Sequence, residues 1–95
     1  MNKEWEKIGY VLASTYRRKI IFALKDGPLT PKQLSQISGI GIGHVSNILR
    51  ELANHNLVKC LNPKMGKGRL YGVTSEGQEV LTFLLKIEKM LEGHG

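Results

Sequence analysis

Three polar side chains have the types and the spacing that suit hydrogen bonding to nucleic-acid bases. His44, Asn47 and Arg50 follow one another at intervals of three residues, so in a helix they occupy neighbouring parts of one face. Asparagine suits the edge of adenine, and arginine suits guanine or a phosphate. The alternative is an ordinary solvated helix face. We expect contact with DNA, because a cationic segment follows along the chain.

The positive charge of the chain is concentrated in its middle. The formal net charge is +6, yet residues 27–75 carry six lysines and arginines against one acid, whereas residues 76–95 carry two lysines against four acids. This distribution favours a polyanionic partner for the middle segment. Lys64, Lys67 and Arg69 are expected to touch phosphates rather than read sequence, the alternative being a solvated loop.

Two helices are expected ahead of the polar face. Apolar residues Ile20, Ile21 and Leu24 recur at helical spacing and predict a helix from Ser14 or Thr15 to Leu24. The turn signal Asp26-Gly27-Pro28 then ends it.

The second helix is expected to be short. Thr30 and Gln33 have the spacing of a capping box, with proline at the first helical position. We expect Leu34 and Ile37 to form its single buried stripe. Ile40 is expected to fill the turn that follows.

A third helix is predicted to carry the polar face. It begins after Gly41 and runs to about His55. Val45, Leu49 and Leu52 recur at helical spacing on the side opposite the polar trio, with Ile48 beside them. A buried stripe of this kind anchors a helix while leaving its outer face free.

A hairpin and a last helix complete the chain. Asn56 is a plausible left-handed helix terminator before strands expected at Leu57–Leu61 and Leu70–Thr74, joined by a basic tip over residues 62–69. Ser75 and Gln78 resemble a second capping box. The helix they open is expected to continue to about Leu91, and Gly93–Gly95 are expected to fray.

The last helix has more apolar surface than one stripe requires. Eight of the twelve residues from 80 to 91 are apolar. The surplus indicates a partner helix, and the apolar residues near the amino terminus are expected to join it in a symmetric homodimer. The alternative is packing of the two termini within one chain. The candidate interface residues are Trp5, Ile8, Val80, Leu84, Ile87 and Leu91.

The order of helix, short helix, turn, helix and basic hairpin is that of a winged helix. We therefore predict a mainly α fold with a small β-hairpin (α+β), a winged helix-turn-helix, as a single domain over 1–95 with its core over about 12–81. The chain resembles small prokaryotic, especially archaeal, winged helix-turn-helix transcriptional regulators of the ArsR/MarR type. The resemblance rests on Leu12–Ile20, Leu29–Leu34, Gly39–Leu49, Asn56–Val58 and Tyr71–Gly77.

The resemblance implies that the third helix enters the major groove of double-stranded DNA while the hairpin, or wing, meets the backbone or minor groove. The candidate DNA-contacting residues are Thr30, Lys32, Ile42, Gly43, His44, Ser46, Asn47, Arg50, Lys64, Lys67 and Arg69. The chain departs from many relatives by having glycine at 41 and 43, which leaves fewer base-reading groups at the start of the recognition helix.

The residues offer little for catalysis or metal binding. Cys60 is the single cysteine, so the paired thiols of metal-sensing ArsR proteins are missing, and we expect a buried strand cysteine. Gly39–Gly43 lacks the preceding strand and the terminal Lys-Ser/Thr of a phosphate-binding loop. No catalytic arrangement can be specified. We therefore expect no enzyme, no cofactor and no metal.

The predicted function is a DNA-binding transcriptional regulator. The alternatives are a winged-helix protein-interaction module and a non-specific chromosomal DNA- or RNA-binding protein. No apolar run is long enough to cross a membrane, and no signal peptide is expected, so the cytoplasm is the expected location. No small-molecule effector can be named.

Overall fold

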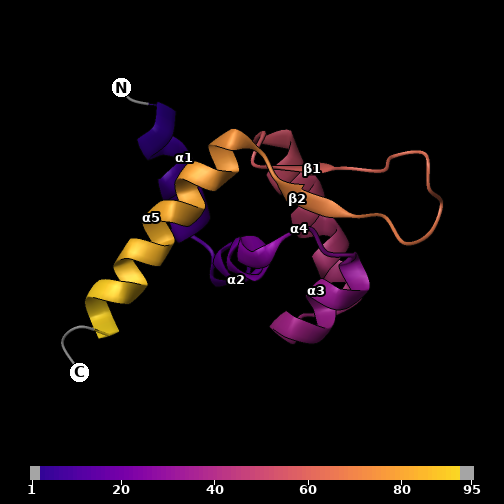
Figure 1. The fold of residues 1–95 in the computed structure, drawn as a ribbon, viewed down its shortest axis with the longest axis horizontal. Helices are drawn as coiled ribbons and strands as arrows, with labels where there is room; N and C mark the ends of the chain where they lie inside the picture. Colours follow the sequence, from indigo (N-terminus) through magenta and orange to yellow (C-terminus); the bar gives the residue numbers. More distant parts are fainter. Residues whose placement is uncertain (1–2, 93–95) are drawn as a thin grey trace.

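The computed structural model describes residues 3–92, and within them the chain forms helices around a short antiparallel hairpin (Figure 1). The expected α+β winged helix-turn-helix is confirmed, whereas the expectation for Gly93–Gly95 lies outside the described residues. The elements are α1 (Lys3–Leu12), α2 (Thr15–Ala23), the 3-10 turn η1 (Leu24–Asp26), α3 (Pro31–Ser38), α4 (Ile42–Asn54), β1 (Val58–Cys60), β2 (Tyr71–Val73) and α5 (Ser75–Glu92).

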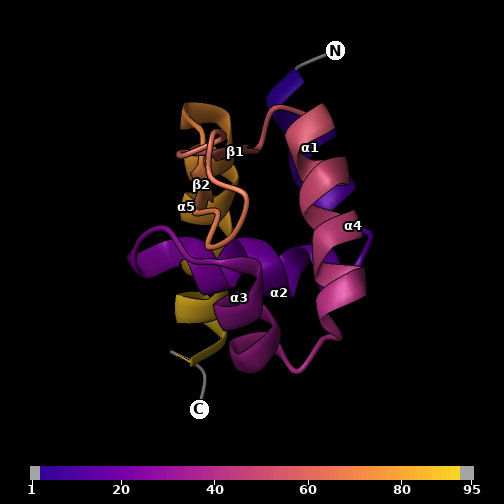
Figure 2. The same cartoon turned by 90° about the vertical axis from the view of Figure 1, so that its right-hand side faces the viewer.

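The helices pack around α2. Figure 1 shows α1 beside α5 at one end of the molecule, α3 and α4 towards the other, and the hairpin loop projecting past them. Figure 2, turned by 90°, shows α4 running along one side of the domain. The fully buried side chains come from every helix and from the segment that enters β1: Val11, Ile20, Ile21, Leu34, Val45, Leu49, Leu52, Leu57, Val80 and Leu81.

Local capping explains where the helix-turn-helix begins. The Thr30 hydroxyl accepts from the Gln33 amide at 3.1 Å, and the Gln33 side chain accepts from the Thr30 amide at 2.9 Å, so the predicted capping box is confirmed. Gly39 ends α3 with a φ of 74°. These two signals fix a short helix and a sharp turn before α4.

One core residue of α3 was predicted wrongly. Ile37 is 63% exposed, whereas Leu34 is fully buried. The helix ends at Ser38, so it presents only one position to α2 and α4. Ile40 is buried after the turn, as expected.

Two further details differ from the sequence prediction. The cap of α5 is Thr74 rather than Ser75, because the Thr74 hydroxyl accepts from the Gly77 amide at 3.0 Å and donates to the Asn56 carbonyl at 2.6 Å. Helix α1 was not predicted, and its residue Val11 joins the core.

The hairpin is shorter than predicted. Val58 pairs with Val73 and Cys60 with Tyr71, and Asn56 has the expected positive φ of 58°. Tyr71 also exchanges two backbone hydrogen bonds with Leu29, of 3.0 and 2.9 Å. This bridge ties the hairpin to the segment that enters α3. Within residues 3–92 no helix is long and apolar enough to span a bilayer.

Candidate nucleic-acid interface

Helix α4 has one buried and one exposed face. Val45, Ile48, Leu49 and Leu52 are at most 7% exposed and hold the helix against the core. The opposite face presents four exposed polar side chains: His44, Ser46, Asn47 and Arg50. The predicted exposure of this face is confirmed, and it has the shape and chemistry of a helix that enters a groove.

The start of α4 offers backbone and apolar surface rather than polar side chains. Its cap is Gly41, which has no side chain to accept from the first amides, and Gly43 is exposed. Ile42 is 54% exposed. The two candidates on the α3 side differ, because Lys32 is exposed whereas the Thr30 hydroxyl is already engaged in the capping box.

An aromatic side chain that sequence reasoning missed lies beside this face. Tyr16, at the start of α2, is 44% exposed and makes an edge contact with His44, with ring centroids 5.6 Å apart. The contact holds the imidazole on one side of the α4 face. No spacing within the sequence connects two residues so far apart.

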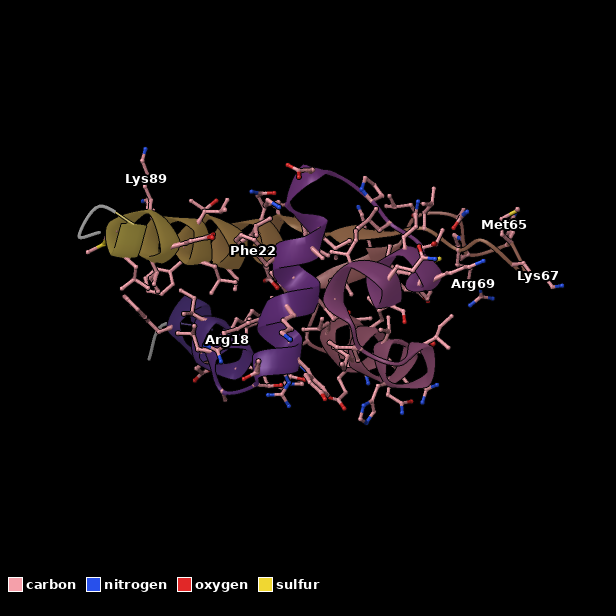
Figure 3. All side chains as sticks on the ribbon, turned by 90° about the horizontal axis from the view of Figure 1, so that it is seen from below. Arg18, Phe22, Met65, Lys67, Arg69 and Lys89 are labelled. Carbon is pink, nitrogen blue, oxygen red and sulfur yellow. The ribbon has the colours of Figure 1, made fainter. Side chains whose placement is uncertain are left out.

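The wing tip is cationic and exposed. Lys64, Lys67 and Arg69 are all exposed, and Figure 3 shows Lys67 and Arg69 with Met65 at the end of the molecule that projects furthest from α5. Arg69 is partly anchored, because its Nε donates to the Met65 carbonyl at 2.8 Å.

The acid nearest the polar trio in the chain is paired. Glu51 lies one residue after Arg50, and its carboxylate is 3.6 Å from the Arg17 guanidinium. A fixed cation at this distance offsets the negative charge of Glu51. The negative charge that Glu51 brings to this part of α4 is therefore partly offset.

A stacked cluster joins α1 and α2 to the end of α4. The Tyr10 ring stacks on His55 at 3.7 Å between centroids, and the Arg17 guanidinium lies over the Tyr10 ring at 3.9 Å. Arg17 also donates to the Tyr10 carbonyl at 2.9 Å. Burial raises the pKa of the Tyr10 phenol above its usual value, and the nearby Arg17 only partly opposes that change.

The apolar residues proposed for a dimer fall into three groups. Trp5 and Leu91 are 61% and 70% exposed, Ile8 and Ile87 are partly buried, and Val80 and Leu84 lie in the core of the chain itself. The exposed apolar surplus on α5 consists of the candidate Leu91 and of two residues that were not among the candidates, Leu85 and Met90. Phe83 of α5 meets Trp5 edge-on at 5.8 Å, which links α1 to the same surface.

Cys60 lies on β1 and is partly rather than fully buried. Its thiol is 3.6 Å from the Asn62 side-chain oxygen. Across residues 3–92 no three histidine, cysteine or acidic side chains are grouped closely enough to hold a metal ion.

Comparison with known proteins agrees with this geometry. Residues 15–59 match the model of the bacterial regulatory protein, arsR family, a segment that spans α2 to β1. No curated protein matches the chain. Solved structures that resemble it include proteins described as transcriptional regulators or repressors.

Three structures illustrate the likeness, and each covers most of the chain. The homodimeric winged helix-turn-helix DNA-binding domain of Mb0332 from Mycobacterium bovis, a possible ArsR-family regulator, has a TM-score of 0.72 at 20% identity, over 96% of this chain and 81% of that one. The repressor BigR from Xylella fastidiosa has a TM-score of 0.73 at 22% identity, over 88% and 85%. The antimony-specific repressor AntR has 0.73 at 24%, over 94% and 81%. At these identities the likeness establishes the fold.

Proposed function

We propose that this chain, whose residues 15–59 carry the helix-turn-helix of the ArsR family, is a homodimeric DNA-binding transcriptional regulator that reads the major groove with α4. The wing contacts the neighbouring backbone or minor groove. The observation that carries the proposal is the exposed trio His44, Asn47 and Arg50 on a helix anchored through its opposite face.

The chemistry of the trio supports reading of bases. Asn47 suits a bidentate contact with adenine, and Arg50 suits guanine or a phosphate. The cations of the wing add affinity that does not depend on sequence. Arg17 partly offsets the negative charge of Glu51, whose carboxylate lies 3.6 Å from its guanidinium.

Dimerisation through α1 and α5 would pair the α4 face of one protomer with the α4 face of a second. The exposed apolar residues of that surface are Trp5, Leu85, Met90 and Leu91. The related Mb0332 domain is described as homodimeric. A twofold axis at this surface would present two copies of α4 to half-sites about 34 Å apart, one turn of DNA.

Selection of bound duplexes from a random pool tests the proposal. An enriched site with twofold symmetry supports both sequence reading and the dimer. The combined variant His44→Ala, Asn47→Ala, Arg50→Ala should then remain folded and lose preference for the selected site, with Asn47→Ala alone costing about 1–3 kcal/mol if the contact is bidentate.

The matched control is Lys86→Ala on α5, which also removes one positive charge but lies on another helix. It should bind the selected site nearly as the parent does. If the folded triple variant binds both selected and scrambled duplexes as the parent does, α4 is not the reading element and the protein-interaction alternative is the better account.

Competition between duplex DNA and RNA separates the remaining alternative. A sequence-reading regulator prefers the selected duplex, whereas a non-specific chromosomal or RNA-binding protein is displaced equally by scrambled DNA or by RNA. A regulator of this kind acts in the cytoplasm, where prokaryotic DNA lies.

A further inference from the structure

The wing loop is closed by one side-chain amide. Asn62 stands two residues after β1, and its Oδ1 accepts from the Leu70 amide at 2.7 Å. Its Nδ2 donates to the Gly68 carbonyl at 3.2 Å. A single planar group therefore joins the outgoing side of the loop to two successive peptide units on the returning side.

The contacts continue from Asn62 to the tip of the wing. The Asn62 carbonyl accepts from the Met65 amide at 3.0 Å, and the Met65 carbonyl accepts from Arg69 Nε at 2.8 Å. Gly68 has a φ of 69°, a conformation that side-chain-bearing residues rarely adopt. The orientation of Arg69 thus depends on a turn that begins at Asn62.

Hydrogen bonds, rather than packing, order this loop. Residues 63–69 are exposed along their whole length, and the last backbone pair of the hairpin is Leu61 with Leu70, at 2.7 Å. An exposed loop with two glycines loses much conformational freedom when it is held in one shape. Removing the Asn62 side-chain amide would therefore let the loop adopt many conformations.

We propose that Asn62 is the positioning residue of the wing: it holds the loop in the arrangement that presents Lys67 and Arg69 to the DNA backbone. The inference rests on the proposed function and deepens it, because Asn62 acts through the cations rather than by touching DNA. The apparent affinity for DNA is proportional to the fraction of time that the wing spends in the binding arrangement, so a less ordered wing binds more weakly.

Amide hydrogen exchange on the free protein is the first test. In Asn62→Ala the amides of Met65 and Leu70 should exchange faster, while that of Leu52 in the core stays protected. In Asn62→Asp the Leu70 amide should keep its acceptor and its protection. Unchanged exchange at Met65 and Leu70 in Asn62→Ala would overturn the inference, whether or not the chain binds DNA.

A double-mutant cycle on the selected duplex is the second test. We define the wing triple variant as Lys64→Ala, Lys67→Ala, Arg69→Ala. Asn62→Ala should weaken binding by roughly tenfold in the parent, as for a wing that is competent about a tenth of the time, and have almost no further effect in the wing triple variant. The control Asn54→Ala, an exposed asparagine at the end of α4, should be neutral in both backgrounds.

These experiments distinguish a failure of the Asn62 inference from a failure of the proposed DNA-binding function. An equal loss in both backgrounds means that Asn62 acts through general stability, and no loss in the parent means that the wing needs no positioning; either result overturns the inference. If the parent selects no duplex, the proposed function fails, and the exchange measurement still decides whether Asn62 orders the loop.

Discussion

The sharpest stability prediction concerns Gly77, the third residue of α5. A Cβ added there would lie 2.0 Å from the Leu57 carbonyl oxygen and 3.1 Å from Val73 Cβ. The Leu57 carbonyl has little room to move, because it accepts from the Thr74 amide at 3.1 Å. Glycine at this position therefore lets α5 start directly against the turn that precedes β1.

The cost of Gly77→Ala follows from that approach. A carbon and a carbonyl oxygen need about 3.3 Å, so helix and turn must separate by more than about 1 Å. Overpacking of this kind costs about 1–3 kcal/mol, and loss of the buried bond between Thr74 and Leu57 adds about 1–3 kcal/mol. Alanine returns at most about 1 kcal/mol of helix propensity. We expect a net loss of roughly 1–6 kcal/mol, with about 3 kcal/mol as its middle value.

Thermal unfolding at one fixed protein concentration measures the effect. For a domain of 95 residues, 1 kcal/mol corresponds to about 4–8 °C, so at the middle value the Tm should fall by about 10 °C or more. The matched control is Gly9→Ala in α1, where nothing lies within 4 Å of the added Cβ. That variant should keep or raise the Tm. Equal shifts in the two variants would refute the steric argument.

Three further predictions use the wing, the dimer surface and Tyr10. The wing triple variant should bind all duplexes more weakly, and the slope of log affinity against log salt concentration should fall by about one unit for each lost phosphate contact. Affinity titrations at several salt concentrations measure this slope, and an unchanged slope would mean that the tip is a solvated loop. The double variant Leu85→Glu, Met90→Glu should sediment as a folded monomer, because both side chains are exposed in one chain and the new charges would lie in the dimer interface. A parent protein that is monomeric at tens of micromolar, a concentration roughly adequate for an interface of standard size, contradicts the dimer. The pKa of Tyr10 is raised above 10.0 in the folded protein, so the stability that its neutral phenol contributes is complete below that pH and is lost as the pH rises through the folded pKa. The free energy of unfolding measured with urea should therefore decline at alkaline pH, and Tyr10→Phe should make that decline shallower.

Features set by neighbours along the chain were predictable from sequence. The capping box at Thr30 and Gln33 and the stripe of Val45, Leu49 and Leu52 depend on residue type and helical spacing within one element. The exposure of His44, Asn47 and Arg50 follows from that stripe, since the opposite face of a helix anchored in this way is free.

Features set by distant contacts were not predictable. Ile37 fits the helical stripe but is exposed, because the neighbouring elements bury α3 only at Leu34. Val80 is buried in its own chain although it was expected at a dimer surface. Asn62 appeared only as one turn former among several. Its partners lie six and eight residues away, across a loop whose path the sequence does not specify.

A tertiary contact links the proposed reading face to the proposed dimer surface within one chain. Tyr10 belongs to α1, which lies against α5 and carries Trp5 of the proposed dimer surface, and it stacks on His55 at the end of α4 while Arg17 of α2 covers its ring. Stacked rings and a bound guanidinium resist sliding of one helix past another. The separation of the two α4 helices in the proposed dimer is therefore a property of the folded protomer, and the half-site spacing of the selected duplex measures it directly.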